Sequence, residues 1–536
     1  MAAKYLISEC LEKIFSNLLE NNNNRYHKST KDIYSCTLVS RHWCRISTPF
    51  LYSYPFHYFY HRNSNNLNKL YYFKLIRTLL GCIPKSEVEQ IISTAVSYNI
   101  QKLLPNSFRF NKKPSSSFDI STTFNYVSLI RGLVFDDTLL SDSLLFHFRE
   151  IWLPSYIPDD KSQIKFSRIS IPIINYLLKY ILEHCNDLKI LDLPFIIRNN
   201  KIIFDMIESL IYEDYNGKNK LKNLKELYAN SVNEKKDLYP VLSKNICNLN
   251  LLYNEGFDSV NSLCRFISLQ KNLKHIILSE SVICDINNLE RRDYNSVFNS
   301  LSTQCESLQA LEFKYLSFIN INENSLKSLC SLKNIKELKL NECKGIGDNL
   351  ISWAKNLSNL EVFEFAKGYH SIVSEEFLIQ LIKASSNTLR KLVISDKRRG
   401  KQLSQLYKQI SIYSNSLMYL DLPKIYPDEL IKIFESCVKL VYICTILSED
   451  GGWEMNIREL GNFIPKNLQR IKFKEINEYI FSSKALKYFF ENCRYHNGKL
   501  KYLELKGSFT FGQHWFDVAK EFDIELKIQI LKLKSP

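Results

Sequence analysis

The cysteines and histidines are the residues of this chain whose chemistry could support metal binding or nucleophilic attack. The 536 residues include 14 cysteines and 10 histidines. The cysteines occur singly, without a Cys-x-x-Cys pair, and they do not gather with histidines into a cluster with zinc-ligand spacing. The sequence therefore predicts no metal site and no cofactor, and in a reducing compartment these cysteines should be free thiols.

Motifs that position catalytic or phosphate-binding groups are also missing. The sequence contains no Walker A loop, no GxSxG, no HExxH and no GxGxxG, and its 14 glycines are scattered. Catalytic triads can assemble from residues that are far apart in sequence, so motif searches alone leave an enzyme as a distant alternative. We expect a protein that is not an enzyme.

Composition points to a globular chain inside the cell. Hydrophobic residues make up 45% and charged residues 24% of the sequence, which is ordinary globular usage. No apolar run approaches the roughly 20 residues of a membrane span, and Glu9 interrupts the N-terminus before a signal peptide could form. We expect a cytoplasmic and/or nuclear protein without membrane contact. The net charge of +15 permits nucleic-acid or acidic partners but requires neither.

A six-residue pattern, Leu-x-x-Leu-x-Leu, organises most of the chain. Its eleven start-to-start intervals average about 28 residues, within the range of about 20–29 residues for leucine-rich repeats. Each copy has the alternation of a short strand, and the intervening residues, such as 374–384 and 427–436, have helical periodicity. Since one unit cannot cover its own apolar strand, we expect the units to stack into an α/β solenoid with parallel strands on its concave face and helices on its convex face. The copies begin at Leu188, Leu224, Leu249, Leu273, Leu308, Ile335, Leu360, Leu389, Leu417, Leu440, Leu468 and Leu500.

These patterns divide the chain into four segments. Residues 1–50 form a small helical domain, and residues 51–165 form a connecting region with room for degenerate first repeats, including a strand-like stretch at 129–135. Residues 166–510 form the solenoid. Residues 511–536 alternate apolar and polar side chains near their end, which predicts a strand that caps the solenoid.

The exposed face of the predicted strands is the candidate binding surface. Strand alternation buries the first, fourth and sixth residues of each copy and exposes the third and fifth. Over twelve copies, the exposed positions hold four basic and seven acidic residues, a net charge of −3, and five tyrosines. Phosphate contacts need Lys and Arg, so this face disfavours nucleic acid, whereas tyrosine is a common anchor at protein interfaces. A sheet surface that only faces solvent and binds nothing could carry the same mixture of charged residues and tyrosines. The candidate substrate contacts are Tyr228, Tyr253, Glu337, Glu364, Tyr419, Asp421, Tyr442 and Tyr502.

The first 46 residues carry a different pattern. Four apolar residues between Leu11 and Leu18 recur at i, i+3, i+4 and i+7, which is one face of a helix. An Asn-rich loop follows, and then two short helical stretches lead to Trp43 and Ile46. Three small helices bury little apolar area alone, so such a unit should complete its core against a partner or the next domain.

This stretch resembles the F-box, the module that binds the Skp-type adaptor of cullin–RING ubiquitin ligases. The second half of the family pattern is matched by Ile33, Cys36, Val39, Ser40, Arg41 and Trp43. Two features depart from the family: Ile7 replaces the usual proline, and the loop between the halves is long. The resemblance implies a set of candidate adaptor contacts. Some members of this set must form the internal core of the three helices, and the sequence alone does not divide them. That set is Leu6, Leu11, Ile14, Phe15, Leu18, Val39 and Trp43.

The later segment resembles the leucine-rich repeats that follow F-boxes, most closely at residues 338–348 with Cys343, Ile346 and Asp348. Together the resemblances imply a non-catalytic, substrate-recognition subunit of a Skp–cullin–F-box ubiquitin ligase. Its partners would be the Skp-type adaptor, through it a cullin, and a protein substrate. Such a subunit acts by raising the effective concentration of its substrate near the ubiquitin-charged enzyme.

Two other functions fit parts of the sequence. A leucine-rich-repeat scaffold without a ligase would use the N-terminal helices only as a solenoid cap, and it would not bind the adaptor. A nucleic-acid-associated repeat protein would use a basic convex or lateral surface, and its binding would weaken steeply with salt.

Overall fold

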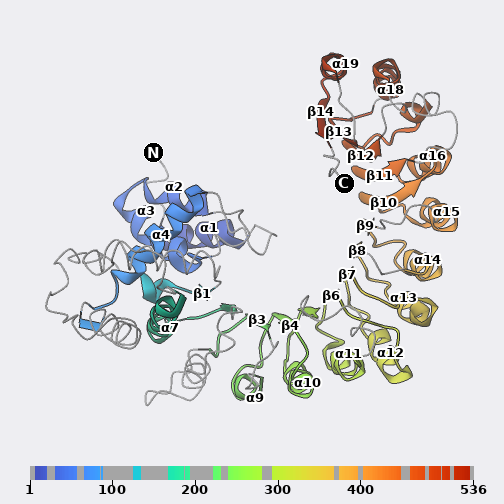
Figure 1. The fold of residues 1–536 in the computed structure, drawn as a ribbon. Helices are drawn as coiled ribbons and strands as arrows, with labels where there is room; N and C mark the ends of the chain where they lie inside the picture. The colour runs from blue at the N-terminus through green and yellow to red at the C-terminus, as the bar shows by residue number, and fades with distance from the viewer. Residues whose placement is uncertain are drawn as a thin grey trace, which may run out of the picture. The chain divides into compact units, whose positions relative to one another are not determined.

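The computed structural model describes sixteen stretches of the chain, which fall into unit 1 (Met1–Asn254) and unit 2 (Glu255–Pro536) (Figure 1). These stretches are residues 7–20, 30–56, 66–84, 86–87, 125–133, 167–185, 187–192, 221–230, 239–280, 292–366, 373–395, 403–447, 459–476, 482–496, 498–507 and 512–530.

Three helices open unit 1, as the sequence predicts: α1 (Ser8–Glu20), α2 (Thr30–Thr37) and α3 (Arg41–Ser53). The side chain of Ser40 caps α3 by accepting a hydrogen bond from the backbone N–H of Trp43. The helix runs three residues beyond the predicted boundary at residue 50, although it contains a proline.

Helix α3 contains an internal proline with side-chain hydroxyl bonds on both sides of it. Pro49 lacks an N–H, so the regular helical bonding is interrupted there. The hydroxyl of Thr48 donates to the carbonyl of Cys44 at 2.7 Å, and that of Ser53 donates to the carbonyl of Pro49 at 2.5 Å. Both hydroxyl groups are thereby satisfied within the helix, which ends at Ser53.

The rest of unit 1 leads into the repeats. The predicted strand-like stretch at 129–135 contains β1, which pairs in parallel with β2, so a repeat-like strand already lies in the connecting region. The remaining elements of unit 1 are α4 (Asn66–Leu80), η2 (Tyr126–Leu129), β1 (Gly132–Leu133), α7 (Ser167–His184), β2 (Ile190–Asp192), β3 (Glu226–Asn230), α9 (Tyr239–Leu242) and β4 (Leu251–Glu255).

Strands and helices alternate through unit 2. The strands are β5 (His275–Ser279), β6 (Ala310–Lys314), β7 (Glu337–Asn341), β8 (Val362–Ala366), β9 (Lys391–Ser395), β10 (Tyr419–Ile425), β11 (Tyr442–Leu447), β12 (Arg470–Ile476), β13 (Tyr502–Gly507) and β14 (Glu525–Ile530). The helices are α10 (Val260–Ser268), α11 (Asn295–Leu301), η6 (Ser302–Gln304), α12 (Glu323–Cys330), η7 (Asp348–Leu350), α13 (Ile351–Lys355), α14 (Glu375–Ala384), α15 (Ser404–Tyr413), α16 (Pro427–Ser436), η8 (Gly461–Phe463), α18 (Ser483–Tyr495) and α19 (Gln513–Glu521).

The sheet follows the chain. Its strands are ordered β1 to β14, and neighbours pair in parallel, as between β6 and β7. Each of the twelve predicted copies gives one strand that starts at the third residue of the copy; Leu308, for example, leads to a strand that begins at Ala310. Within unit 2 the strands line the inner side and the helices the outer side (Figure 1). The predicted fold class, an α/β leucine-rich-repeat solenoid, is confirmed.

The repeat leucines form the core that the alternation predicts. In the copy from Ile335, the side chains of Ile335, Leu338 and Leu340 are all fully buried. The last predicted strand is present as β14, which pairs in parallel with β13. The capping segment also contains α19, which packs Trp515 and Ala519 inward.

A ladder of polar side chains joins neighbouring repeats at the position directly before the first leucine of several copies. The amide of Asn359 donates to the carbonyl of Lys333 at 3.0 Å, and the amide of Asn467 donates to the carbonyl of Val438 at 3.1 Å. Thr388 and Ser416 bond the preceding repeat in the same way. These bonds satisfy carbonyls that the parallel strands leave unpaired.

Replacing Asn359 with alanine should therefore lower the free energy of unfolding by about 1 kcal/mol, the usual value of one hydrogen bond. Urea unfolding followed by circular dichroism measures the change. Asn261, which is exposed on α10, provides the control: its replacement with alanine should leave stability unchanged or slightly raised, because alanine favours helix. Equal losses in both variants would contradict the role of the ladder.

Candidate functional site

The structure divides the predicted adaptor-binding residues between a core and a surface. Leu11 and Phe15 are fully buried and pack with Ile46. Leu18 and Trp43 lie partly buried against this core, with the rings of Phe15 and Trp43 edge to face at 5.8 Å. A partner could not reach Leu11 or Phe15 without unfolding the helices. Leu6 lies outside the described residues.

Several apolar side chains around this core face solvent. Among the described contact residues that the sequence predicted, Ile14 and Val39 are the exposed ones, at 40% and 57%. Ile7, Tyr34 and Leu38, which the sequence prediction omitted, are also exposed. We call these five residues the N-terminal apolar set. Exposed apolar side chains can serve as contacts for a protein partner.

The strand face of unit 1 is covered, contrary to the prediction of an open groove. Ile190, Tyr228 and Leu251 occupy predicted exposed positions, yet they form a buried cluster. Tyr54, from the segment that follows α3, and Tyr253 pack against this cluster. Tyr228 is therefore a packing residue, with its hydroxyl donating to Glu226, and the open part of the strand face lies in unit 2.

Acidic residues on β6 to β8 are paired with lysines of the same face. Nζ–O distances are 3.1 Å for Lys314–Glu312, 2.5 Å for Lys339–Glu337 and 2.6 Å for Lys391–Glu364. Burial alone would lower the pKa of Lys339, but the carboxylates of Glu337, Glu364 and Glu312 raise it above its usual value. The predicted contacts Glu337 and Glu364 are thus neutralised within the sheet.

A continuous stack of cations and rings crosses β9 to β12. The rings of Tyr419 and Tyr442 are parallel within 13° with centroids 4.2 Å apart. The ammonium of Lys391 lies 4.9 Å from the centroid of Tyr419, and the guanidinium of Arg470 lies 5.6 Å from that of Tyr442. The four residues are register partners on successive strands, and Tyr502 continues the row on β13. We call Lys391, Tyr419, Tyr442 and Arg470 the cation–tyrosine stack.

Two ion-pair groups lie beside this stack. Asp421 pairs with Lys474 at 2.6 Å. Glu504 accepts from both Arg470 at 2.8 Å and Lys472 at 2.5 Å. Burial alone would raise the pKa of Glu504, but the hydrogen bonds from Lys472 and Arg470 outweigh it and hold the pKa below its usual value. One carboxylate therefore serves two cations, which leaves a local excess of positive charge.

The β9–β13 part of the strand face is more basic than the predicted face as a whole. The prediction of −3 summed the third and fifth positions of all twelve copies. In the five copies that form β9–β13, the same positions already sum to +1. Strands β10 to β13 are longer than the repeat motif and carry a further outward-facing row. On the described face of β9–β13 there are six basic residues and two acidic ones, a net charge of +4. The basic residues are Lys391, Lys424, Arg470, Lys472, Lys474 and Lys506, and the acidic residues are Asp421 and Glu504.

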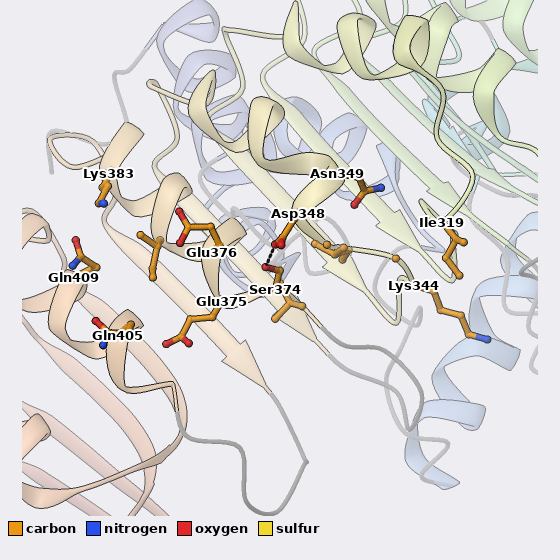
Figure 2. A pocket seen from close by; sticks show the side chains of 15 residues that line it. Ile319, Lys344, Asp348, Asn349, Ser374, Glu375, Glu376, Lys383, Gln405 and Gln409 are labelled. Carbon is orange, nitrogen blue, oxygen red and sulfur yellow. Dashed lines mark hydrogen bonds between the residues drawn. The ribbon is translucent and has the colours of Figure 1, made fainter.

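An open hollow of about 1050 Å³ lies at the edge of the solenoid, between the turn that follows β7 and the first turns of α14 and α15 (Figure 2). Its acidic side chains are engaged in bonds within the fold. Asp348 accepts from the hydroxyl of Ser374 at 2.5 Å, and Glu375 accepts from the backbone N–H of Leu406 at 2.9 Å. Glu375 thereby caps α15 in the next repeat, so these residues hold repeats together.

The described residues contain no group of histidine, cysteine and acidic side chains placed to hold a metal ion. Nor does a helix in this part of the chain have the length and apolar character needed to cross a membrane. The described cysteines are free thiols. Cys343, Cys437 and Cys444 are buried, as expected for packing residues.

Burial makes these three thiols unreactive. It raises the pKa of Cys343 and of Cys437 to about 12, and that of Cys444 to about 11. At pH 8 only about 1 in 1,000 or fewer of these thiols would be thiolate, which is the reactive form. Brief iodoacetamide treatment of the native protein at pH 8 should label the exposed Cys10 and spare all three. Peptide mass spectrometry measures the labelling, and denaturation in urea should make all four react; fast native labelling of Cys343 would contradict its placement.

Comparisons with known proteins give a loose structural likeness and no family. Among solved structures, the chain is similar to the leucine-rich repeat-containing protein LegL7 from Legionella pneumophila, with 15% identity and a TM-score of 0.33 over 59% of this chain and 93% of that one. So loose a likeness carries no argument. No model of a protein family matches the chain, and no curated protein matches it. The solenoid assignment rests on the sheet order and repeat register described above.

Proposed function

We propose that this chain is the substrate-recognition subunit of a Skp–cullin–F-box ubiquitin ligase, in which the N-terminal helices bind the Skp-type adaptor and the strand face of unit 2 holds a protein substrate. The observation that carries the proposal is the exposed pair Ile14 and Val39. These two residues belong to the F-box-like motif and remain outside the core built by Leu11 and Phe15.

The proposed role is non-catalytic and needs no cofactor. The adaptor would bring a cullin, and the solenoid would bring the substrate, so that the chain acts by holding the two together. Such a ligase works on proteins of the cytoplasm and/or nucleus, where we place this chain. The apolar character of the exposed set supports a protein partner, since apolar side chains at the centre of an interface supply much of its affinity.

Binding to purified Skp-type adaptor tests the proposal. The full-length chain should be retained on immobilised adaptor, and a variant with Ile14→Asp and Val39→Asp should not, because it places charges in an apolar interface. Both substituted positions are exposed, so the variant should keep its circular dichroism spectrum. Ile412→Asp, at an exposed apolar residue of α15, is the control and should bind like the original chain. Absence of binding by the original chain, or equal binding by all three, would overturn the proposal.

The position of Ile7 favours a second candidate. Ile7 stands where the F-box pattern has proline, and it is exposed. A leucine-rich-repeat scaffold without a ligase would tolerate this change, because its N-terminal helices would serve only to cap the solenoid. Such a scaffold would fail to bind the adaptor while retaining ligand binding on the strand face of unit 2.

A further inference from the structure

We propose that the strand face of β9–β13 binds an acidic, extended segment of the substrate protein. This inference names the chemistry of the substrate and in that sense rests on the proposed function, although the binding itself does not need the adaptor. It replaces the acidic groove that the sequence suggested, because that groove would have selected a basic segment.

Charge is the first support. The described face of β9–β13 carries six basic and two acidic side chains. Asp421 is neutralised by Lys474, and the nearly buried Glu504 is shared between Arg470 and Lys472. Both acids are therefore already satisfied. Lys391 also pairs with Glu364 on the neighbouring strand β8, so the six cations meet three carboxylates and a net charge of +3 remains. An incoming carboxylate would find charge complementarity along the face.

The cation–tyrosine stack is the second support, and it favours a carboxylate over a nucleic-acid base. Tyr419 has Lys391 over one face and Tyr442 over the other, while Tyr442 has Tyr419 and Arg470. Single-stranded nucleic acid binds by stacking bases on free ring faces, and in this stack both faces of each ring are occupied. The rings present their edges, which are the positive part of the aromatic quadrupole. Ring edges and cations together suit an anion.

Spacing sets the shape of the ligand. Adjacent strands lie about 4.8 Å apart, so Lys391 on β9 and Arg470 on β12 belong to strands about 14 Å apart. An extended peptide that crosses the strands advances about 3.3 Å per residue. Acidic residues four positions apart could therefore approach both ends of the stack, while an alternating pattern keeps the acidic side chains on one side.

Fluorescence anisotropy with the full-length chain tests this inference. The probe is a labelled peptide of about twelve residues that alternates Glu and Ser, long enough to cross β9–β13. Matched peptides with Gln or Lys in place of Glu, and a single-stranded oligouridylate of similar charge, are the competitors. We expect the Glu peptide to bind with a Kd on the order of tens of micromolar at low salt and to weaken as salt rises. The Gln and Lys peptides should not bind.

A charge-removal variant locates the site. Arg470→Gln with Lys424→Gln should weaken binding of the Glu peptide at least about tenfold, since two of the six cations are lost. Glu504 keeps Lys472 as its partner in this variant, so the fold should persist, as thermal unfolding would show. Lys355→Gln with Lys408→Gln removes the same charge from exposed positions on α13 and α15 and should leave binding unchanged.

Three results would overturn the inference: equal binding of the Glu and Gln peptides, equal weakening by both double variants, or tighter binding of the oligouridylate that Arg470→Gln with Lys424→Gln abolishes. The last would assign the face to nucleic acid. The variant with Ile14→Asp and Val39→Asp should bind the Glu peptide normally. Failure of the peptide experiment is thereby distinguished from failure of the adaptor experiment, because each uses a different surface and a different ligand.

Discussion

Replacing Arg292 with alanine is expected to lower the stability of unit 2 by about 3 kcal/mol, the low end of the usual cost of removing one partner from a buried ion pair, because Arg292 itself is partly exposed. Glu280 follows β5 and is fully buried. One guanidinium nitrogen of Arg292 lies 3.0 Å from each carboxylate oxygen of Glu280, and the hydroxyl of Tyr294 donates to the same carboxylate at 2.8 Å. Without Arg292 the buried negative charge loses its cationic partner.

The measurement is urea unfolding together with hydrogen exchange, because solenoids can open one repeat at a time. Protection should fall most at β5 and β6, the strands nearest Glu280. Arg265, which is exposed on α10, is the matched control, and its replacement with alanine should change stability by less than about 0.5 kcal/mol. A loss below about 1 kcal/mol for Arg292→Ala would show that water replaces the guanidinium and that the pair does not hold this repeat.

Replacing Trp353 with alanine is expected to cost about 3–5 kcal/mol, the range for large aromatic residues in a core. Trp353 projects from α13 and is fully buried. Its ring lies 6.1 Å from that of Phe318 and 6.3 Å from that of Phe377, so it joins three consecutive repeats. Alanine would leave a cavity that the stacked units on both sides could not close.

A phenylalanine substitution separates shape from polarity. Among the described residues the indole N–H of Trp353 has no hydrogen-bond acceptor, and an unsatisfied buried group costs about 1–3 kcal/mol. Trp353→Phe removes that cost while keeping most of the ring, so it should destabilise by much less than Trp353→Ala in urea unfolding. Tyr495→Ala, at an exposed aromatic position, should be nearly neutral. Equal losses for the alanine and phenylalanine variants would contradict the packing explanation.

The repeat pattern allowed much of the fold to be predicted, because leucine spacing and strand alternation are local properties. The strand of each copy begins at its third residue, and the leucines of a copy such as that from Ile335 are buried as expected. The ladder of Asn359 and Asn467 was also visible in the sequence. Asparagine, serine or threonine stands directly before the first leucine of most copies. The sequence prediction did not use this signal.

The site was less predictable, because it depends on contacts between distant segments. Helical periodicity places Leu11 and Ile14 on one face, yet only the packing of α3 decides that Leu11 is buried and Ile14 exposed. Tyr228 has the position of a groove residue, but Tyr54, far away in sequence, covers its cluster. The size of the positive charge on β9–β13 depended on strand length, since Lys424, Lys474 and Lys506 lie beyond the six-residue motif.

The central claim is that one chain joins an adaptor to a bound acidic segment, and a bridging measurement tests it most directly. Purified Skp-type adaptor is immobilised, the full-length chain is added, and retention of the labelled Glu–Ser peptide is measured. The account predicts that the peptide is retained only when the chain is present. Either Ile14→Asp with Val39→Asp or Arg470→Gln with Lys424→Gln should abolish retention, the first by losing the chain and the second by losing the peptide. Retention of neither chain nor peptide by the adaptor would contradict the account.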